Sequence, residues 1–265
     1  MKKVDEQRDD INHEKRFGLL LATKDSEYVK NMYGGYLNVF MAAFGEEGER
    51  WDLFRVVEGE FPELEELAKY DGFVVSGSPY DAYGNQPWII KLCSLLHTLD
   101  SMGKKVLGIC FGHQVICRAL GGKVGKADSG WDLGIRKVKI TKDLVPLISR
   151  YVKELEMELE LDDIPASLSI VECHQDEVWE VPLGANVIAY SDKTGVEMFT
   201  IEDHILGIQG HPEYTKDILN NIIDRLLNNH SIERGLAEDA KFKLQIGEPD
   251  RKCWEKICRN FLKGT

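Results

Sequence analysis

Residues 105–120 decide the fold, and they read Lys105-Val-Leu-Gly-Ile109 followed by Cys110-Phe-Gly-His-Gln-Val-Ile-Cys-Arg-Ala-Leu120. The first five residues form a short apolar run of the kind that makes a buried strand. The residues after Cys110 have a helical pattern that ends at Gly121-Gly122, because glycine commonly terminates a helix. The sequence therefore predicts a strand that turns sharply into a helix, with Cys110 at the turn.

The turn Gly108-Ile-Cys110-Phe-Gly112 has the G-x-C-x-G pattern, the thiol counterpart of the G-x-S-x-G nucleophile elbow. A sharp turn crowds the residues two before and two after the nucleophile, so glycine is expected at both places. The helix N-terminus is expected to lower the pKa of Cys110, and the N–H of Phe111 to donate to an oxyanion. The five residues alone also fit a buried structural cysteine before an ordinary turn.

A second motif, Gly210-His211-Pro-Glu213, supplies a base for this thiol. Pro212 favours an extended chain at His211, so the side chains of His211 and Glu213 project to the same side. An imidazole takes the thiol proton and returns it to a leaving amine, while a carboxylate orients the ring. A histidine at a strand end beside a surface glutamate is the alternative interpretation.

The segment Asp71-Gly-Phe-Val-Val-Ser-Gly77-Ser78 is predicted to be a strand followed by a glycine loop. In a parallel sheet this loop would end at the same edge as Cys110. Gly77 leaves room for its N–H to approach a developing oxyanion. By itself, however, the segment also fits a simple turn between a strand and a helix.

Strands alternating with helices in the first half predict an open, mostly parallel sheet flanked by helices, and later strands predict antiparallel additions. We expect a polar tail over residues 1–15 and a single domain over residues 16–265, with C-terminal helices at 229–265. The predicted strands are 16–22, 51–57, 71–78, 105–109, 136–141, 169–173, 186–190, 196–201 and 205–209. The predicted helices are 26–33, 36–44, 61–70, 88–102, 111–120, 215–228, 232–243 and 251–262.

The composition excludes several classes of protein. The 265 residues are 43% hydrophobic and 29% charged, which is enough for a sizeable core. A net charge of −12 disfavours nucleic acid and anionic membranes as partners. Residues 1–14 lack the apolar run of a secretory signal, so a cytosolic protein with reduced cysteines is expected. No spacing of His, Cys and Asp indicates a metal site, and no cofactor is expected.

Three separated motifs together resemble the class I glutamine amidotransferase domain: S-G-S at 76–78, G-I-C-F-G-H-Q at 108–114 and G-H-P-E at 210–213. The likeness covers residues 17–227. It implies a flavodoxin-like open α/β sheet and assigns roles residue by residue. The implied catalytic triad is Cys110, His211 and Glu213, the oxyanion donors are Gly77 and Phe111, and the amide of Gln114 holds the glutamyl part of the substrate.

Three further stretches resemble the plant γ-glutamyl peptidases: 33–40, 173–178 and 251–264. The resemblance implies a cytosolic enzyme that removes γ-glutamate from glutathione conjugates in sulfur metabolite biosynthesis, including that of glucosinolates. Further candidates for the substrate pocket are Tyr33, Ser78, Trp131, His174 and Asp176. For the first of these a helix break is an alternative interpretation, and for the His174-Gln-Asp176 stretch a capped turn is another.

The predicted reaction is hydrolysis of a γ-glutamyl bond through a γ-glutamyl thioester on Cys110, which releases glutamate and a Cys-Gly conjugate. No synthetase domain is recognisable, so no obligatory synthase partner is expected. The main alternative is a glutaminase subunit that delivers ammonia to a partner synthase. A non-catalytic binding module and a secreted or vacuolar folate γ-glutamyl hydrolase fit less well, because the triad is complete and no signal segment is recognisable.

Overall fold

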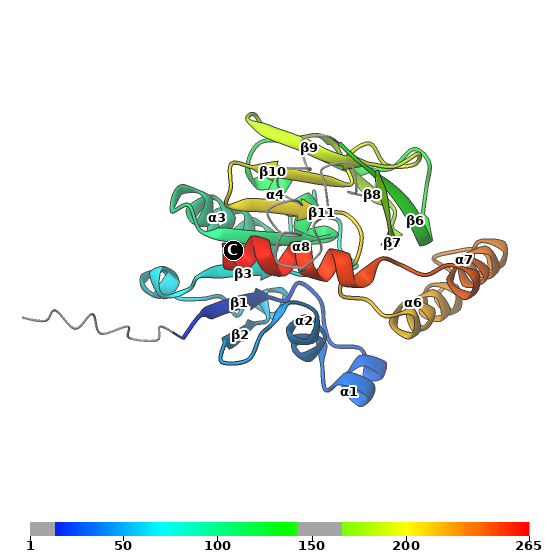
Figure 1. Cartoon of the computed structure of the whole chain (residues 1–265), viewed down its shortest axis with the longest axis horizontal. Coiled ribbons are helices and arrows are strands. Elements are labelled where there is room, and N and C mark those ends of the chain that lie inside the picture. The colour runs from blue at the N-terminus through cyan, green and yellow to red at the C-terminus, as the bar shows by residue number, and fades with distance from the viewer. Residues whose placement is uncertain (1–13, 142–165, 265) are drawn as a thin grey trace, which may run out of the picture.

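The computed structural model describes residues 14–141 and 166–264, and its central feature is a nine-stranded sheet (Figure 1). The strand order is β2-β1-β3-β4-β11-β10-β9-β6-β7. The strands are β1 (Arg16–Leu20), β2 (Arg50–Phe54), β3 (Gly72–Val75), β4 (Lys105–Ile109), β6 (Asp132–Ile140), β7 (Ser167–His174), β9 (Ala185–Tyr190), β10 (Met198–Ile201) and β11 (Ile205–Ile208).

Two kinds of strand pairing divide the sheet. One part of the sheet is parallel and contains β2, β1, β3, β4 and β11, in that order. Strands β11, β10, β9, β6 and β7 pair antiparallel. This arrangement confirms the predicted parallel sheet with antiparallel additions. It also brings the carboxyl ends of β3, β4 and β11 to one edge, where the three motifs of the sequence meet.

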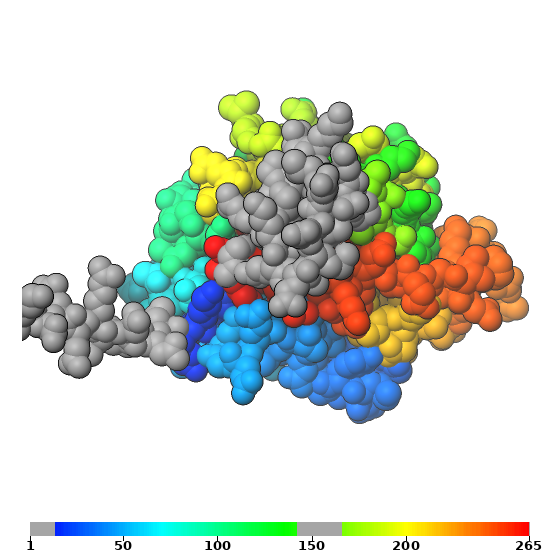
Figure 2. Space-filling model, in the orientation of Figure 1, coloured from blue at the N-terminus to red at the C-terminus, as the bar shows by residue number. Residues whose placement is uncertain are grey.

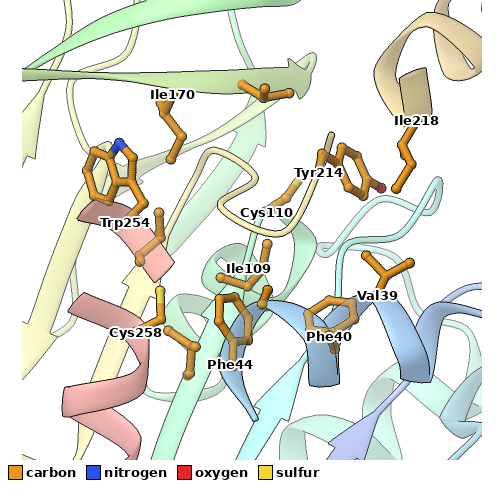
Figure 3. Packing of buried hydrophobic residues seen from close by; sticks show 14 of the residues in the cluster. Val39, Phe40, Phe44, Ile109, Cys110, Ile170, Tyr214, Ile218, Trp254 and Cys258 are labelled. Atoms are coloured by element: carbon orange, nitrogen blue, oxygen red, sulfur yellow. The ribbon is translucent and has the colours of Figure 1, made fainter. Parts of the chain in front are cut away.

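Helices cover both faces of the sheet (Figure 1). One core cluster contains side chains from α1, α2, α6, α7 and α8, and the other contains side chains from α3 and α4. Figure 3 shows Phe40 and Phe44 of α2 packed near Ile109 of β4. The helices are α1 (Glu27–Tyr33), α2 (Tyr36–Phe44), α3 (Pro87–Ser101), α4 (Phe111–Ala119), α6 (Lys216–Asn228), α7 (Arg234–Ile246) and α8 (Arg251–Lys263).

Two of the differences between the predicted and the observed elements have a clear local cause. The helix expected at residues 61–70 is a 3₁₀ turn, η2 (Leu64–Lys69). Its buried Leu67 and Tyr70 are three residues apart, which is the period of a 3₁₀ turn rather than an α-helix. The strand expected to end at residue 57 stops at Phe54, because η1 (Val56–Glu58) turns the chain and buries Val56.

A small second sheet was not predicted. It pairs β5 (Lys123–Lys126) with β8 (Asp176–Glu180) in antiparallel orientation. Both strands are short, and β5 is largely exposed, so neither has a strong apolar pattern.

The division into a tail at 1–15 and one domain stays a prediction, since residues 1–13 and 142–165 lie outside the described residues.

In the space-filling view, α7 forms a projection at one end of the molecule, beside α6 (Figure 2). Among the described residues, no helix combines the length and the apolar character that crossing a membrane requires.

Candidate active site

Cys110 occupies a sharp elbow between β4 and α4. Its φ of 53° and ψ of −104° lie in a region that non-glycine residues rarely adopt. The elbow is held on both sides, because the N–H of Cys110 donates to the carbonyl of Ile208 at 2.8 Å and its carbonyl accepts from the N–H of Gln114 at 3.1 Å. The side chain is 6% exposed, so the thiol lies in a largely dry site.

The two glycines of the elbow are needed for space. A Cβ on Gly108 would lie 2.6 Å from the carbonyl carbon of Gly112, as the sequence pattern predicts. A Cβ on Gly112 would instead lie 2.3 Å from the carbonyl oxygen of Val75 on the neighbouring strand. The second glycine is thus required by close packing of the helix start on β3, and not only by crowding within the elbow.

His211 and Glu213 lie in the segment after β11 and face the elbow. Nδ1 of His211 is 2.9 Å from Oε1 of Glu213, and both side chains are almost fully buried. The ring of His211 also stacks in parallel on Tyr214, with ring centroids 3.9 Å apart. The ring of His211 and the thiol of Cys110 lie near enough for each to shift the pKa of the other. The arrangement is that of a thiol, a base and an orienting carboxylate.

Burial and neighbouring charges shift the pKa values of Cys110 and His211 in opposite directions. Burial raises the pKa of the Cys110 thiol, and the neighbouring His211 offsets only part of that rise. The expected net lowering of this pKa by the helix N-terminus is therefore not found. Burial also opposes a charged ring at His211, but the charges of Glu213 and Cys110 raise its pKa to about 10. Because Glu213 is hydrogen-bonded to the ring, an imidazolium is favoured that can pair with a thiolate during attack.

Gly77 lies directly against the pair. A Cβ at Gly77 would be 2.8 Å from Cε1 of His211 and 3.7 Å from Cβ of Cys110. The loop is fixed by its serines, since Ser76 accepts from the N–H of Ala22 at 2.9 Å and Ser78 donates to the carbonyl of Ala22 at 2.7 Å. This placement is consistent with an oxyanion site between the N–H groups of Gly77 and Phe111, although the donor roles themselves stay predictions.

A cavity of about 100 Å³ opens above the thiol. Among the predicted substrate-binding residues, Ser78 and Trp131 line it, together with Gly77 and the Cys–His pair. The hydroxyl of Ser78 is already bonded to the backbone, so it shapes the wall more than it offers a free donor. The full lining is Thr23, Tyr36, Gly77, Ser78, Pro79, Cys110, Trp131, Cys173, His211, Tyr214, Ile222, Arg225 and Leu226.

Gln114 and Tyr33 do not line this cavity. The amide nitrogen of Gln114 donates to the carbonyl of Asp176 at 2.8 Å and to Gln209 at 3.0 Å, so this buried side chain ties α4 to β8. The hydroxyl of Tyr33 is bonded to Asp217 at 2.8 Å, at the start of α6. For neither residue does the structure show a direct path to the thiol.

His174 and Asp176 also lie outside the lining. Nδ1 of His174 is 2.9 Å from the carbonyl of Asp176, and its ring points toward Glu172. The side chain of Asp176 accepts a long hydrogen bond from Tyr83 at 3.4 Å. Of the two interpretations left open for this stretch, the local turn contacts are the ones that the structure shows.

Two residues that line the cavity, Arg225 and Tyr214, were not predicted from the sequence. Arg225 is on α6, and among the described residues no ion partner for its guanidinium is found. A signal was present, because Arg225 follows Ile218 and Ile222 at i+7 and i+3 and so lies in the apolar stripe of its helix. Tyr214 adjoins the histidine motif, but its stacking on the imidazole is a tertiary contact that the motif does not predict.

Replacement of Glu213 by glutamine is expected to leave weak activity. The loss of kcat/KM should be about three orders of magnitude, because an orienting carboxylate matters less than the thiol. Removing the carboxylate charge also removes a factor that raises the pKa of His211. The imidazolium is then lost at lower pH, so the basic limb of the pH profile of kcat/KM should move to lower pH.

The matched control for this variant is Glu248→Gln, because the side chain of Glu248 is 84% exposed and pairs with Lys216 rather than with a residue of the triad. It should leave both the rate and the pH profile unchanged. A Glu213→Gln enzyme with the full rate of the unmodified protein would remove Glu213 from the triad.

Comparison with known sequences places the chain in a family. The family described as "Glutamine amidotransferase class-I" matches residues 28–226. The chain is 54% identical to γ-glutamyl peptidase 3 of Arabidopsis thaliana, over 96% of this chain and 99% of that protein. It is 32% identical to one subunit of the glutamine-hydrolysing GMP synthase of Archaeoglobus fulgidus, over 70% of this chain and 87% of that protein.

Solved structures show the same fold at low sequence identity. A glutamine amidotransferase from Thermotoga maritima matches with a TM-score of 0.68 and 19% identity, over 95% of this chain and 99% of that one. A glutamine amidotransferase from Methylobacillus flagellatus matches with a TM-score of 0.67 and 16% identity, over 95% of this chain and 94% of that one. With its elbow, its sheet and these relatives, the chain belongs to the class I glutamine amidotransferase family.

Proposed function

We propose that this protein is a γ-glutamyl peptidase that hydrolyses the γ-glutamyl bond of glutathione S-conjugates. The observation that carries the proposal is the 52–54% identity, over 94–96% of the chain, to four Arabidopsis proteins named γ-glutamyl peptidases. The proposal extends to a cytosolic location, to action without a synthase partner, and to processing of conjugates in sulfur metabolite biosynthesis of the glucosinolate type.

The dimensions of the site support a small glutamyl group with a larger leaving part. The cavity of about 100 Å³ is smaller than the about 300–1,000 Å³ that encloses a drug-sized ligand. It therefore suits the glutamyl half, while the rest of a conjugate lies outside. Arg225 lines this cavity and is itself exposed, so it can pair with a substrate carboxylate there.

The proposed reaction has two steps. The thiolate of Cys110 attacks the γ-carbonyl carbon, and the N–H groups of Gly77 and Phe111 stabilise the oxyanion. The imidazolium of His211 gives its proton to the leaving amine as the C–N bond breaks, which releases the Cys-Gly conjugate and leaves a γ-glutamyl thioester. His211 then takes a proton from water, and the resulting hydroxide attacks the thioester carbon. The C–S bond breaks, glutamate is released, and Cys110 and His211 return to their starting state.

A second candidate function is a glutaminase that passes ammonia to a separate synthase. The similarity to a protein of a GMP synthase favours it, because that synthase is named as glutamine-hydrolysing. Glutamine and a γ-glutamyl peptide share the glutamyl half, and only the leaving group differs. The same elbow and base would serve both reactions.

The two functions are separated by giving the purified protein free glutamine in one reaction and an S-substituted glutathione in another. We expect rapid release of glutamate and of the Cys-Gly conjugate from the second substrate, and slow release from the first. Activity on glutamine alone, or no activity until a synthase is added, would replace the peptidase with the glutaminase component of an amidotransferase.

Replacing Arg225 is predicted to weaken substrate binding and to leave the chemical step nearly unchanged. Arg225→Ala should raise KM for a glutathione conjugate about tenfold with little change in kcat, because a partly exposed charge pair contributes about 1–2 kcal/mol. Arg225→Lys should recover part of the loss. The control is Arg234→Ala on α7, outside the cavity lining. An unchanged KM in Arg225→Ala would exclude a carboxylate contact at this residue.

A further inference from the structure

Three ionisable side chains meet in the interior beside the catalytic segment: Glu172, His174 and Glu197. Glu172 and His174 are two residues apart on β7, and Glu197 directly precedes β10. One ligand atom from each side chain lies within 4.8 Å of the other two. Their exposed fractions are 0%, 4% and 2%, so the group is shielded from bulk water.

The tautomer of His174 points a lone pair into this group. Its Nδ1 is 2.9 Å from the carbonyl oxygen of Asp176, which can only accept, so Nδ1 carries a proton. In a neutral ring Nε2 is then unprotonated, and it lies 3.4 Å from Oε2 of Glu172. Two lone pairs at this distance repel each other unless a proton or a metal ion lies between them.

The surrounding charges do not balance the two carboxylates. Arg136 is the nearby cation that favours an ionised Glu172, but it is already bonded to both oxygens of Asp132. That pair is neutral by itself, so the negative charge of ionised Glu172 and Glu197 would be unbalanced unless protons or a bound cation neutralise it. Burial raises the pKa of both carboxyl groups well above the ordinary value, helped by the charge of Asp132 at Glu172 and by the charge of Glu172 at Glu197.

The oxygens of the two carboxyl groups have few partners. Both oxygens of Glu172, both oxygens of Glu197 and Nε2 of His174 lack a well-formed hydrogen bond. The hydroxyl of Ser191, whose Oγ accepts from the N–H groups of Lys193 and Thr194, lowers the pKa of Glu197 but does not offset the rise that burial causes. Buried polar atoms without partners destabilise the folded state. A ligand that binds these atoms and neutralises their charge would remove this destabilisation.

We propose that Glu172, His174 and Glu197 form a structural binding site for one divalent transition-metal ion of the zinc type. Imidazole nitrogen and carboxylate oxygen are ligands that such ions accept, and two carboxylates match a charge of +2. The bond from Nδ1 of His174 to a backbone carbonyl is also the support that metal-bound histidines usually have. The chain spacing concealed the site, because Glu197 lies 23 positions after His174 in sequence.

The proposed metal site lies next to the catalytic pair. Glu172 precedes Cys173, whose carbonyl oxygen lies 3.9 Å from the Cys110 sulfur. A Cβ on Gly210 would lie 2.6 Å from Oε1 of Glu172, so this carboxylate abuts the segment that carries His211. A bound ion would therefore fix the end of β7 against the segment that carries His211, the catalytic base.

The test measures metal binding without using activity. Full-length Cys110→Ala protein, which lacks the active-site thiol, is freed of metal with a chelator and titrated with Co²⁺ and then Zn²⁺. We expect one Co²⁺ for each chain, visible ligand-field absorption without a sulfur-to-cobalt charge-transfer band, displacement by Zn²⁺, and a higher melting temperature with Zn²⁺. A charge-transfer band would overturn the proposal, because it would place the ion on a cysteine.

Glu197→Gln and Glu172→Gln, each in the Cys110→Ala background, test the ligands. Each should weaken Zn²⁺ binding by at least about tenfold, since even outer-shell partners of metal ligands have effects of that size. The control is Glu202→Gln, whose side chain is 81% exposed at the turn after β10. If the protein without these substitutions takes up no Co²⁺, or if Glu197→Gln binds as tightly as the control, the carboxyl groups are protonated instead and the proposal fails.

Discussion

Replacing Cys110 by alanine is expected to lower kcat/KM by at least about four orders of magnitude, because the thiol is the only group that forms the covalent intermediate. The fold should survive, since the change removes one sulfur atom beside an open cavity. Substrate binding should persist as well, because Arg225 and the cavity walls are untouched. Release of glutamate from an S-substituted glutathione measures the first effect, and thermal unfolding and ligand titration measure the others.

The control for this experiment is Cys253→Ala, because Cys253 is another free cysteine, half-buried on α8 and outside the cavity. Its activity should equal that of the unmodified protein. A quenched reaction of the unmodified enzyme should also show Cys110 carrying the mass of one γ-glutamyl group. Multiple turnovers by Cys110→Ala, or the label on a different cysteine, would contradict the assignment of the nucleophile.

The strands and helices around the nucleophile were predictable because their patterns are locally complete. β4 was predicted with the bounds Lys105–Ile109 that the structure shows, and α4 differs from its prediction by one residue. The reason is that a fully apolar strand, two glycines and a helix stop occur in one continuous segment. The small β5–β8 sheet lacks these signals, because its stability comes from contacts between segments about 50 residues apart.

The candidate site was predictable mainly where the local backbone fixes the position of a residue. Cys110, His211 and Gly77 are placed by turns that glycine and proline specify, and the structure brings them together. The side chain of Gln114 could not be placed, because its partners come from β8 and from the end of β11. The direction of the Cys110 pKa also depended on burial by distant segments, which no motif reveals.

Substitution of Gly77 by alanine is expected to impair catalysis by displacing the base. The new methyl group would lie 2.8 Å from Cε1 of His211, a distance that real contacts do not tolerate. The loop cannot easily retreat, because Ser76 and Ser78 are bonded to Ala22 just after β1. The imidazole must therefore move, and a displacement of about 1 Å in a catalytic group lowers kcat/KM about 10²-fold.

The displaced base has a second consequence that activity alone would not show. With His211 moved from the thiol, Cys110 should react more slowly with iodoacetamide at neutral pH, because less thiolate forms. The control is Gly195→Ala, since a methyl group there meets no atom within 4 Å and should change neither rate. Gly77→Ala with an unchanged melting temperature and slow alkylation would support a base held against Gly77. Full activity and unchanged alkylation would mean that the base acts from another position, and that the glycine is required only by its turn.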